Sequence, residues 1–184
     1  MIDFNHIKDL KELNFSKNEL THGDEFTNVG HLEVFDGTFC QLTSVEFLAK
    51  AHKLKALNLY TNRITSIDCL HEDKEIEDLN VDRNQIQSIE FRKYMKNLKI
   101  ISLENNNISD LKPLENLHEL CIVDLYNNNI HDLRPLAGLE FISYLRLDHN
   151  MIKDLTPISN LRFLRQLKLT SHYITDVTQL KDLQ

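Results

Sequence analysis

The fold is decided by a stretch that reads LKIISLENNNI at residues 98–108 and returns as LCIVDLYNNNI at residues 120–130. The two stretches begin 22 residues apart, and both place apolar residues at positions one, four, six and eleven and asparagine at position nine. Toward both ends of the chain the same spacing holds without a slip, which gives eight repeats of 22 residues. The repeats begin at Leu10, Leu32, Leu54, Ile76, Leu98, Leu120, Ile142 and Leu164.

Four columns of the repeat are apolar, and Gly37 at position six of the second repeat is their one exception. Positions four and six alternate with polar neighbours, which predicts a short strand with one face turned inward. A strand of this length cannot bury its apolar face alone. Stacked copies must therefore supply a continuous core and pair as a parallel sheet.

Position nine is predicted to form a ladder of buried polar side chains. The chain must turn sharply after each strand, which frees backbone donors and acceptors inside the coil, and an asparagine amide supplies both a donor and an acceptor. Cys40 fills the same position with weaker bonds, and His172 is tolerated in the last copy. The predicted ladder consists of Asn18, Cys40, Asn62, Asn84, Asn106, Asn128 and Asn150.

The second half of the repeat reads Asp-Leu-x-Pro-Leu at residues 110–114 and 132–136. Proline suits the first position of a short helix, and the aspartate three residues earlier places negative charge near that helix start. Apolar residues at three-residue spacing favour a 3₁₀ or single-turn helix on the return path. Asp73 and Arg92 interrupt this pattern, so we expect a looser surface around them.

The columns resemble the leucine-rich repeat signature L-x-x-L-x-L-x-x-N/C-x-L over residues 10–184. The Asp-Leu-x-Pro-Leu segments resemble the 22-residue class of these repeats, whose members include the internalins and a nuclear regulatory subunit of protein phosphatase 1. The resemblance implies an α/β fold: a right-handed solenoid with a parallel β-sheet on the concave face and short 3₁₀ or α turns on the convex face. It also implies protein recognition by the concave sheet. We expect one leucine-rich repeat domain over residues 1–184, with a half-repeat at residues 1–9.

Composition and motifs argue against several function classes. A net charge of -7 is not the basic footprint of a nucleic-acid binder, and no apolar stretch approaches the roughly 20 residues that cross a bilayer. Residues 1–10 lack the apolar core of a secretory signal, so we expect a cytoplasmic protein. The cysteines and histidines show no metal-ligand spacing, and we expect neither metal nor cofactor. Without a glycine-rich phosphate loop, a nucleophile elbow or a cysteine–histidine signature, we expect no enzyme.

Positions three, five, seven and eight are predicted to point away from the core and to form the concave face. Ile100, Ile122 and Tyr144 occupy position three in adjacent repeats, and exposed contiguous apolar area usually marks a binding surface. Acids surround this row, so we predict a protein partner with basic and large apolar residues. The alternative is that these side chains merely pack laterally across the sheet. The predicted surface consists of Phe39, Tyr60, Asp82, Ile100, Glu104, Ile122, Asp124, Tyr126, Tyr144, Arg146 and Asp148.

Three roles remain open from the sequence. The first is an interaction module, such as a scaffold or a regulatory subunit. The second is the recognition part of a larger enzyme or of a secreted host-interaction protein. The third is a structural repeat that assembles end to end, which is suggested by Leu180 and Leu183 in a last repeat with little cover.

Overall fold

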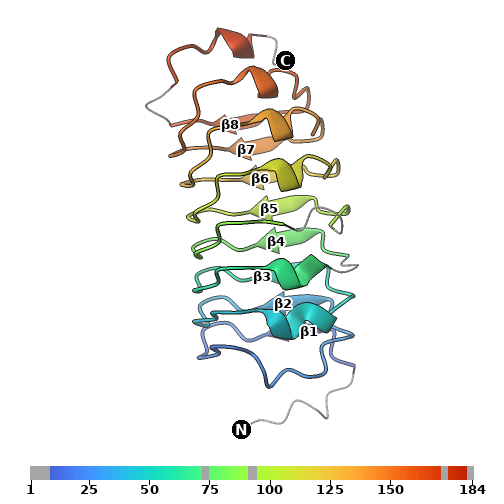
Figure 1. Ribbon diagram of the computed structural model, residues 1–184. Helices are drawn as coiled ribbons and strands as arrows, with labels where there is room; N and C mark the ends of the chain where they lie inside the picture. Colours follow the sequence, from blue (N-terminus) through green and yellow to red (C-terminus); the bar gives the residue numbers. More distant parts are fainter. Residues whose placement is uncertain (1–8, 72–74, 91–94, 171–173, 182–184) are drawn as a thin grey trace.

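The computed structural model describes residues 9–71, 75–90, 95–170 and 174–181, in which the chain winds as a solenoid (Figure 1). Each coil gives one strand to a single eight-stranded sheet, whose strand order follows the sequence. All seven strand pairings are parallel. The strands are β1 (Glu12–Asn14), β2 (Val34–Asp36), β3 (Ala56–Asn58), β4 (Asp78–Asn80), β5 (Ile100–Ser102), β6 (Ile122–Asp124), β7 (Tyr144–Arg146) and β8 (Gln166–Lys168).

Neighbouring strands pair so that equal repeat positions stand side by side. Ile101 of β5 pairs with Val123 of β6, which pairs with Leu145 of β7, and all three side chains are fully buried. Positions four and six of the central coils therefore form one continuous apolar column under the sheet. The predicted α/β solenoid with a parallel sheet is confirmed.

Gly37 interrupts this column without leaving a hole, because a large ring fills the space. A Cβ atom added at Gly37 would lie 2.7 Å from the ring of Phe35. Phe35 in turn contacts Phe26 and Phe47 edge to face or nearly so, with ring centroids 6.3 and 5.5 Å away. In the second coil, the phenylalanine ring at position four thus fills the space that a position-six side chain occupies in the other coils.

Buried asparagine side chains join consecutive coils from inside. The Asn128 amide nitrogen donates to the Leu103 carbonyl of the preceding coil (2.8 Å) and to the Leu125 carbonyl of its own coil (3.3 Å). Its amide oxygen accepts the Ile108 N–H at 3.0 Å. One side chain therefore satisfies backbone groups of two coils at once. The same pattern recurs at Asn62, Asn84, Asn106 and Asn150.

The two N-terminal members of this column bond differently. The Cys40 thiol donates to the Phe15 carbonyl at 3.2 Å, and burial raises the pKa of that thiol, which keeps the donor proton in place. Within the described residues, Asn18 donates to the carbonyls of Phe15 and Ser16 in its own coil, and it is exposed. His172 lies outside the described residues, as do Asp73, Arg92 and residues 1–8 of the expected half-repeat.

Short 3₁₀ helices lie on the side of the coil opposite the sheet (Figure 1). The sequence placed proline at the first helical position, but Pro113 stands at the second position of its helix. The reason is that the Asp110 carboxylate accepts the N–H of Lys112 at 2.8 Å, so the first position needs a residue with an N–H. The helices are η2 (Glu46–Lys50), η3 (Asp68–His71), η4 (Lys112–Leu114), η5 (Arg134–Leu136), η6 (Thr156–Ile158) and η7 (Thr178–Leu180).

The bonds of Asn128 predict a large difference between two adjacent asparagines. Replacing Asn128 by alanine should lower the free energy of unfolding by about 3 kcal/mol, because buried backbone groups of two coils lose their partner. Asn129 is exposed, and Asn129→Ala should change stability by less than about 0.5 kcal/mol. Urea unfolding followed by circular dichroism measures both. Equal effects of the two substitutions would contradict the proposed role of the buried column.

Candidate protein-binding surface

The concave face carries a contiguous apolar row at position three. Ile100, Ile122 and Tyr144 pair with one another in register across β5, β6 and β7. Ile122 is 37% exposed, and the other two side chains are half-buried. Lys168 of the next coil lies over the Tyr144 ring at 5.6 Å. The row therefore offers apolar area that the chain itself does not cover completely.

At position eight, after the strands β1 to β7, the backbone is left-handed. Seven residues there have φ between 50° and 60°, and none is glycine, although this conformation costs other residues roughly 1–2 kcal/mol. Phe39 at this position is 49% exposed and packs edge to face on Tyr60, with ring centroids 5.5 Å apart. These two predicted residues thus form a group of their own near the N-terminal end of the face. The seven residues are Lys17, Phe39, Thr61, Arg83, Asn105, Asn127 and His149.

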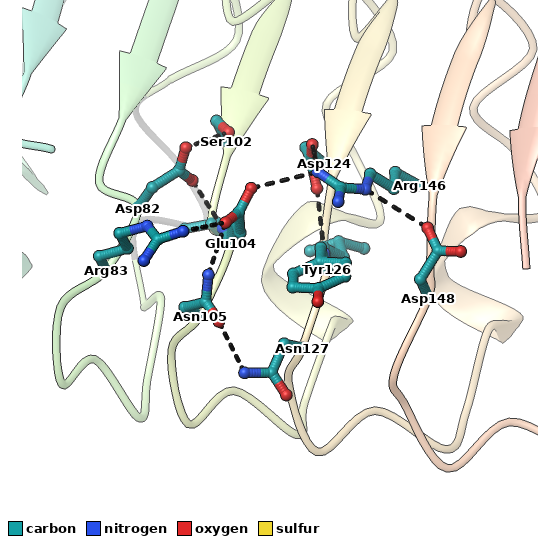
Figure 2. Close-up of polar contacts among 12 residues, drawn as sticks. Asp82, Arg83, Ser102, Glu104, Asn105, Asp124, Tyr126, Asn127, Arg146 and Asp148 are labelled. Carbon is teal, nitrogen blue, oxygen red and sulfur yellow. Dashed lines mark hydrogen bonds and ion pairs between the residues drawn. The ribbon is translucent and has the colours of Figure 1, made fainter. Parts of the chain in front are cut away.

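Arg146 is the centre of the C-terminal half of the face (Figure 2). Its guanidinium donates to Glu104 at 3.1 Å, to Asp124 at 3.2 Å and to Asp148 at 3.3 Å. The same group lies 4.1 Å from the centre of the Tyr126 ring. Five predicted site residues therefore come together, but as an internal network in which one cation is shared by three carboxylates. This part of the surface pairs laterally, as the alternative interpretation of the sequence required.

Asp82 and Asp148, predicted as partner-binding residues, need correction because both are only 6% exposed. Asp82 accepts the Glu104 N–H and the Ser102 hydroxyl, at 2.6 and 2.9 Å. Asp148 accepts the N–H and hydroxyl of Thr170, at 2.8 and 2.6 Å. In each case the carboxylate is used by the following coil. Neither aspartate is free to receive a partner.

The physical reason lies at position five, where most strands end in an Asn or Asp. The Asn80 side chain accepts the Asp82 N–H at 3.0 Å, two residues on, and Asp124 does the same for Tyr126. Ser102 and Lys168 hold position five in two later coils, and the N–H two residues on is accepted instead by the aspartate of the preceding coil. The sequence carries part of this signal, because an aspartate at position seven precedes the coils of β5 and β8. The coil of β7, with Arg146 at position five, is the exception, since Tyr126 precedes it.

The two aspartates differ in their electrostatics. Burial raises the pKa of Asp82 to about 6, although hydrogen bonds from Ser102 and Glu104 act to lower it. Burial also acts to raise the pKa of Asp148, but hydrogen bonds from Thr170 and the nearby Arg146 outweigh that effect and leave the pKa below its ordinary value. The same repeat position therefore holds one carboxylate that resists ionisation and one that favours it.

Among the described residues no group of three or more His, Cys, Asp or Glu side chains is placed to hold a metal ion. Nor does any helix in the described ranges have the length and apolar character to cross a membrane. What the face offers chemically is apolar area, aromatic rings and hydrogen-bonding groups.

A rescue experiment tests the role of Asp82. Asp82→Ala leaves the Glu104 N–H without its acceptor, and adding Ser102→Asn should restore one, because asparagine at position five accepts that N–H elsewhere in the chain. We expect the double variant to be more stable than Asp82→Ala by roughly 1–2 kcal/mol in urea unfolding. Both variants lack the carboxylate, so its charge does not enter the comparison. Equal stability of the two variants would contradict the exchange of acceptors between coils.

A second prediction concerns pH. The pKa of Asp82 rises from 3.8 to about 6 on folding, so between these values the native state binds more protons and its stability falls as pH rises. Asp82→Asn removes this loss and keeps an oxygen for Glu104, so its stability relative to the parent chain should rise by about 3 kcal/mol between pH 4 and pH 8. For Asp148 the sign is opposite: its ionised form stabilises the fold above its unfolded pKa. Because the folded pKa of Asp148 lies below 3.8, Asp148→Asn should lose stability, relative to the parent, as pH rises toward 3.8, and should change little above that value. Unfolding curves that extend well below pH 4 for Asp148→Asn and cover pH 4 to pH 8 for Asp82→Asn measure both, and the same direction for both would refute the assignment.

The chain was compared with protein-family models, with curated proteins and with solved structures, and only the solved structures gave matches. No protein-family model matches the sequence, and a search of curated proteins finds no match. Among solved structures, internalin C2 of Listeria monocytogenes is similar with a TM-score of 0.86 and 30% identity, over 89% of this chain and 73% of the internalin.

Two plant receptors share the fold at lower identity. One is the leucine-rich repeat ectodomain of the Arabidopsis thaliana membrane receptor kinase GASSHO1/SCHENGEN3, in complex with CASPARIAN STRIP INTEGRITY FACTOR 2. Its TM-score is 0.76 at 21% identity, over 85% of this chain and 20% of the receptor. The other is the plant peptide hormone receptor RGFR1 in complex with RGF2, with a TM-score of 0.70 at 19% identity, over 97% of this chain and 36% of the receptor.

The repeat columns, the eight parallel strands and the similarity to internalin C2 lead to one conclusion. This chain belongs to the leucine-rich repeat family, in its 22-residue class.

Proposed function

We propose that this chain is a non-enzymatic interaction module that binds a protein partner on its concave face. The observation that carries the proposal is the position-three row of Ile100, Ile122 and Tyr144, which is contiguous across three strands and partly open to solvent. Apolar area of this kind on a rigid sheet usually marks a binding surface. Aromatic residues typically supply the energetic anchors of such surfaces.

Two further observations support a protein ligand. The structurally similar plant receptors were both solved in complex with a partner, one of them as a peptide hormone receptor. The negative net charge of -7 disfavours nucleic acid, whose phosphates repel an acidic surface. A scaffold or regulatory subunit is the role that such a module most directly fills.

The paired acids have a different task in this proposal. Glu104 and Asp124 already form ion pairs with Arg146, so the main contribution of these three residues is to hold Tyr126 in place beside the apolar row. Such fixed charges favour specificity and orientation more than affinity. The binding energy therefore comes from the row and from the aromatic rings.

Alanine substitutions on two surfaces test the proposal. The partner is first captured from source cells on the immobilised chain, identified by mass spectrometry and purified. Ile122→Ala/Tyr144→Ala should then weaken its binding by about 2 kcal/mol, roughly 30-fold, in calorimetric titration. Phe141→Ala/Phe163→Ala is the matched control: these exposed rings, stacked 5.7 Å apart, lie at the position that precedes each repeat. Their loss should leave affinity unchanged.

Each other outcome overturns the proposal. Undiminished affinity of the concave variant would exclude the row as the binding site. Loss of affinity in the Phe141/Phe163 variant alone would place the binding site on the segments that precede β7 and β8. Loss of folding in the concave variant, followed by thermal unfolding, would assign the row to lateral packing instead.

A further inference from the structure

A depression in the N-terminal half of the concave face lies outside the surface that the sequence predicted. Its volume is about 300 Å³, and it spans β2, β3 and β4. Val34 and Ala56 line it at position three, next to each other in register. The depression exists because Ala56 is small where later coils carry Ile100, Ile122 and Tyr144 in the same column.

Two carboxylates flank this apolar floor. Asp36 follows Val34 at position five of β2, whereas Asp78 stands at position three of β4, beside Ala56 in the register. The two aspartates thus come from the strands on either side of β3 and are offset by two residues along the strand direction, which puts their Cα atoms roughly 12 Å apart at the usual spacings. Asn58 and Asn80 complete the polar side, and their amide oxygens accept the N–H groups of Tyr60 and Asp82.

No cation in the part of the chain that the structure describes pairs with these carboxylates. Asp36 accepts hydrogen bonds from the Thr38 N–H and the Asn14 amide, but over residues 9–71, 75–90, 95–170 and 174–181 neither it nor Asp78 forms an ion pair. Desolvation raises the pKa of Asp78. The acids around Arg146 are in the opposite condition, because each already has a cationic partner.

We propose that the depression is the subsite for a lysine or arginine side chain of the protein partner, with its methylene stem over Val34 and Ala56 and its cationic end between Asp36 and Asp78. This inference rests on the proposed function and moves the basic preference of the partner from the acids near Arg146 to the N-terminal coils. An apolar floor suits a methylene stem, which long basic side chains bury while the charge stays polar. A bare metal ion would gain nothing from that floor.

The test uses small probes, so it does not depend on the partner. The complete, isotope-labelled chain is titrated with n-butylguanidinium, and amide NMR signals are followed. We expect saturable shifts at Val34, Ala56 and Asn80, which are lost in Asp36→Asn/Asp78→Asn or require a concentration at least roughly tenfold higher. Asparagine at position five keeps the turn, as Asn58 and Asn80 do. Asp124→Asn, in the paired cluster, should leave the shifts intact, and butanesulfonate should cause none.

Several results would overturn the subsite. These are unsaturable shifts spread over the acidic surface, shifts that survive the double substitution, equal shifts with butanesulfonate, and stronger shifts with Ca²⁺ or Mg²⁺ at the same residues. The two proposals fail separately. If butylguanidinium binds but the partner's affinity is unchanged by Ile122→Ala/Tyr144→Ala, only the proposed binding row is refuted. If the probe does not bind but Ile122→Ala/Tyr144→Ala weakens partner binding, only the proposed subsite is refuted.

Discussion

Each coil of this protein can satisfy its buried backbone only through the coil beside it. The amide of Asn128 bonds a carbonyl of its own coil together with an N–H and a carbonyl of the preceding one, and the asparagines at position nine of the other central coils repeat these bonds. Apolar columns at positions four and six supply the energy of stacking, but they would tolerate small slips. The asparagine bonds do not, because their donors and acceptors match at only one register. The regular parallel sheet is a consequence of that register.

Exchange between neighbours also explains the concave face. Asp82 and Asp148 are held by the coil that follows them, and Arg146 is held by acids of three coils. The C-terminal half of the face is thus internally satisfied and presents apolar and aromatic area. The N-terminal half keeps a small residue, Ala56, and two carboxylates that form no ion pair within the described residues, and so presents a charged depression. One sheet carries two kinds of surface because the acids around Arg146 form ion pairs along the solenoid axis, whereas Asp36 and Asp78 form none within the described residues.

Much of this architecture could be predicted from the sequence, since the inward columns are set by a fixed spacing and by elementary burial. The placement of proline was wrong by one position, because the preceding aspartate needs an N–H to accept. Asp82 and Asp148 were assigned to the partner because a single repeat, considered alone, leaves them facing outward. Their true acceptor role depends on Ser102 and Lys168 in the next coil. The depression at Ala56 escaped prediction for the same reason: a hollow is a property of three neighbouring strands, not of one column.

The left-handed residues after the strands β1 to β7 have a consequence for how such a chain changes over time. Their backbone is strained for any side chain, yet phenylalanine, arginine, asparagine and histidine all occupy the position. A conformation that penalises Phe39 and Arg83 alike does not discriminate between them, so mutation can exchange one for another at little additional cost. Position eight therefore provides a series of exchangeable residues along the solenoid, where new recognition properties can arise while the buried core is unchanged.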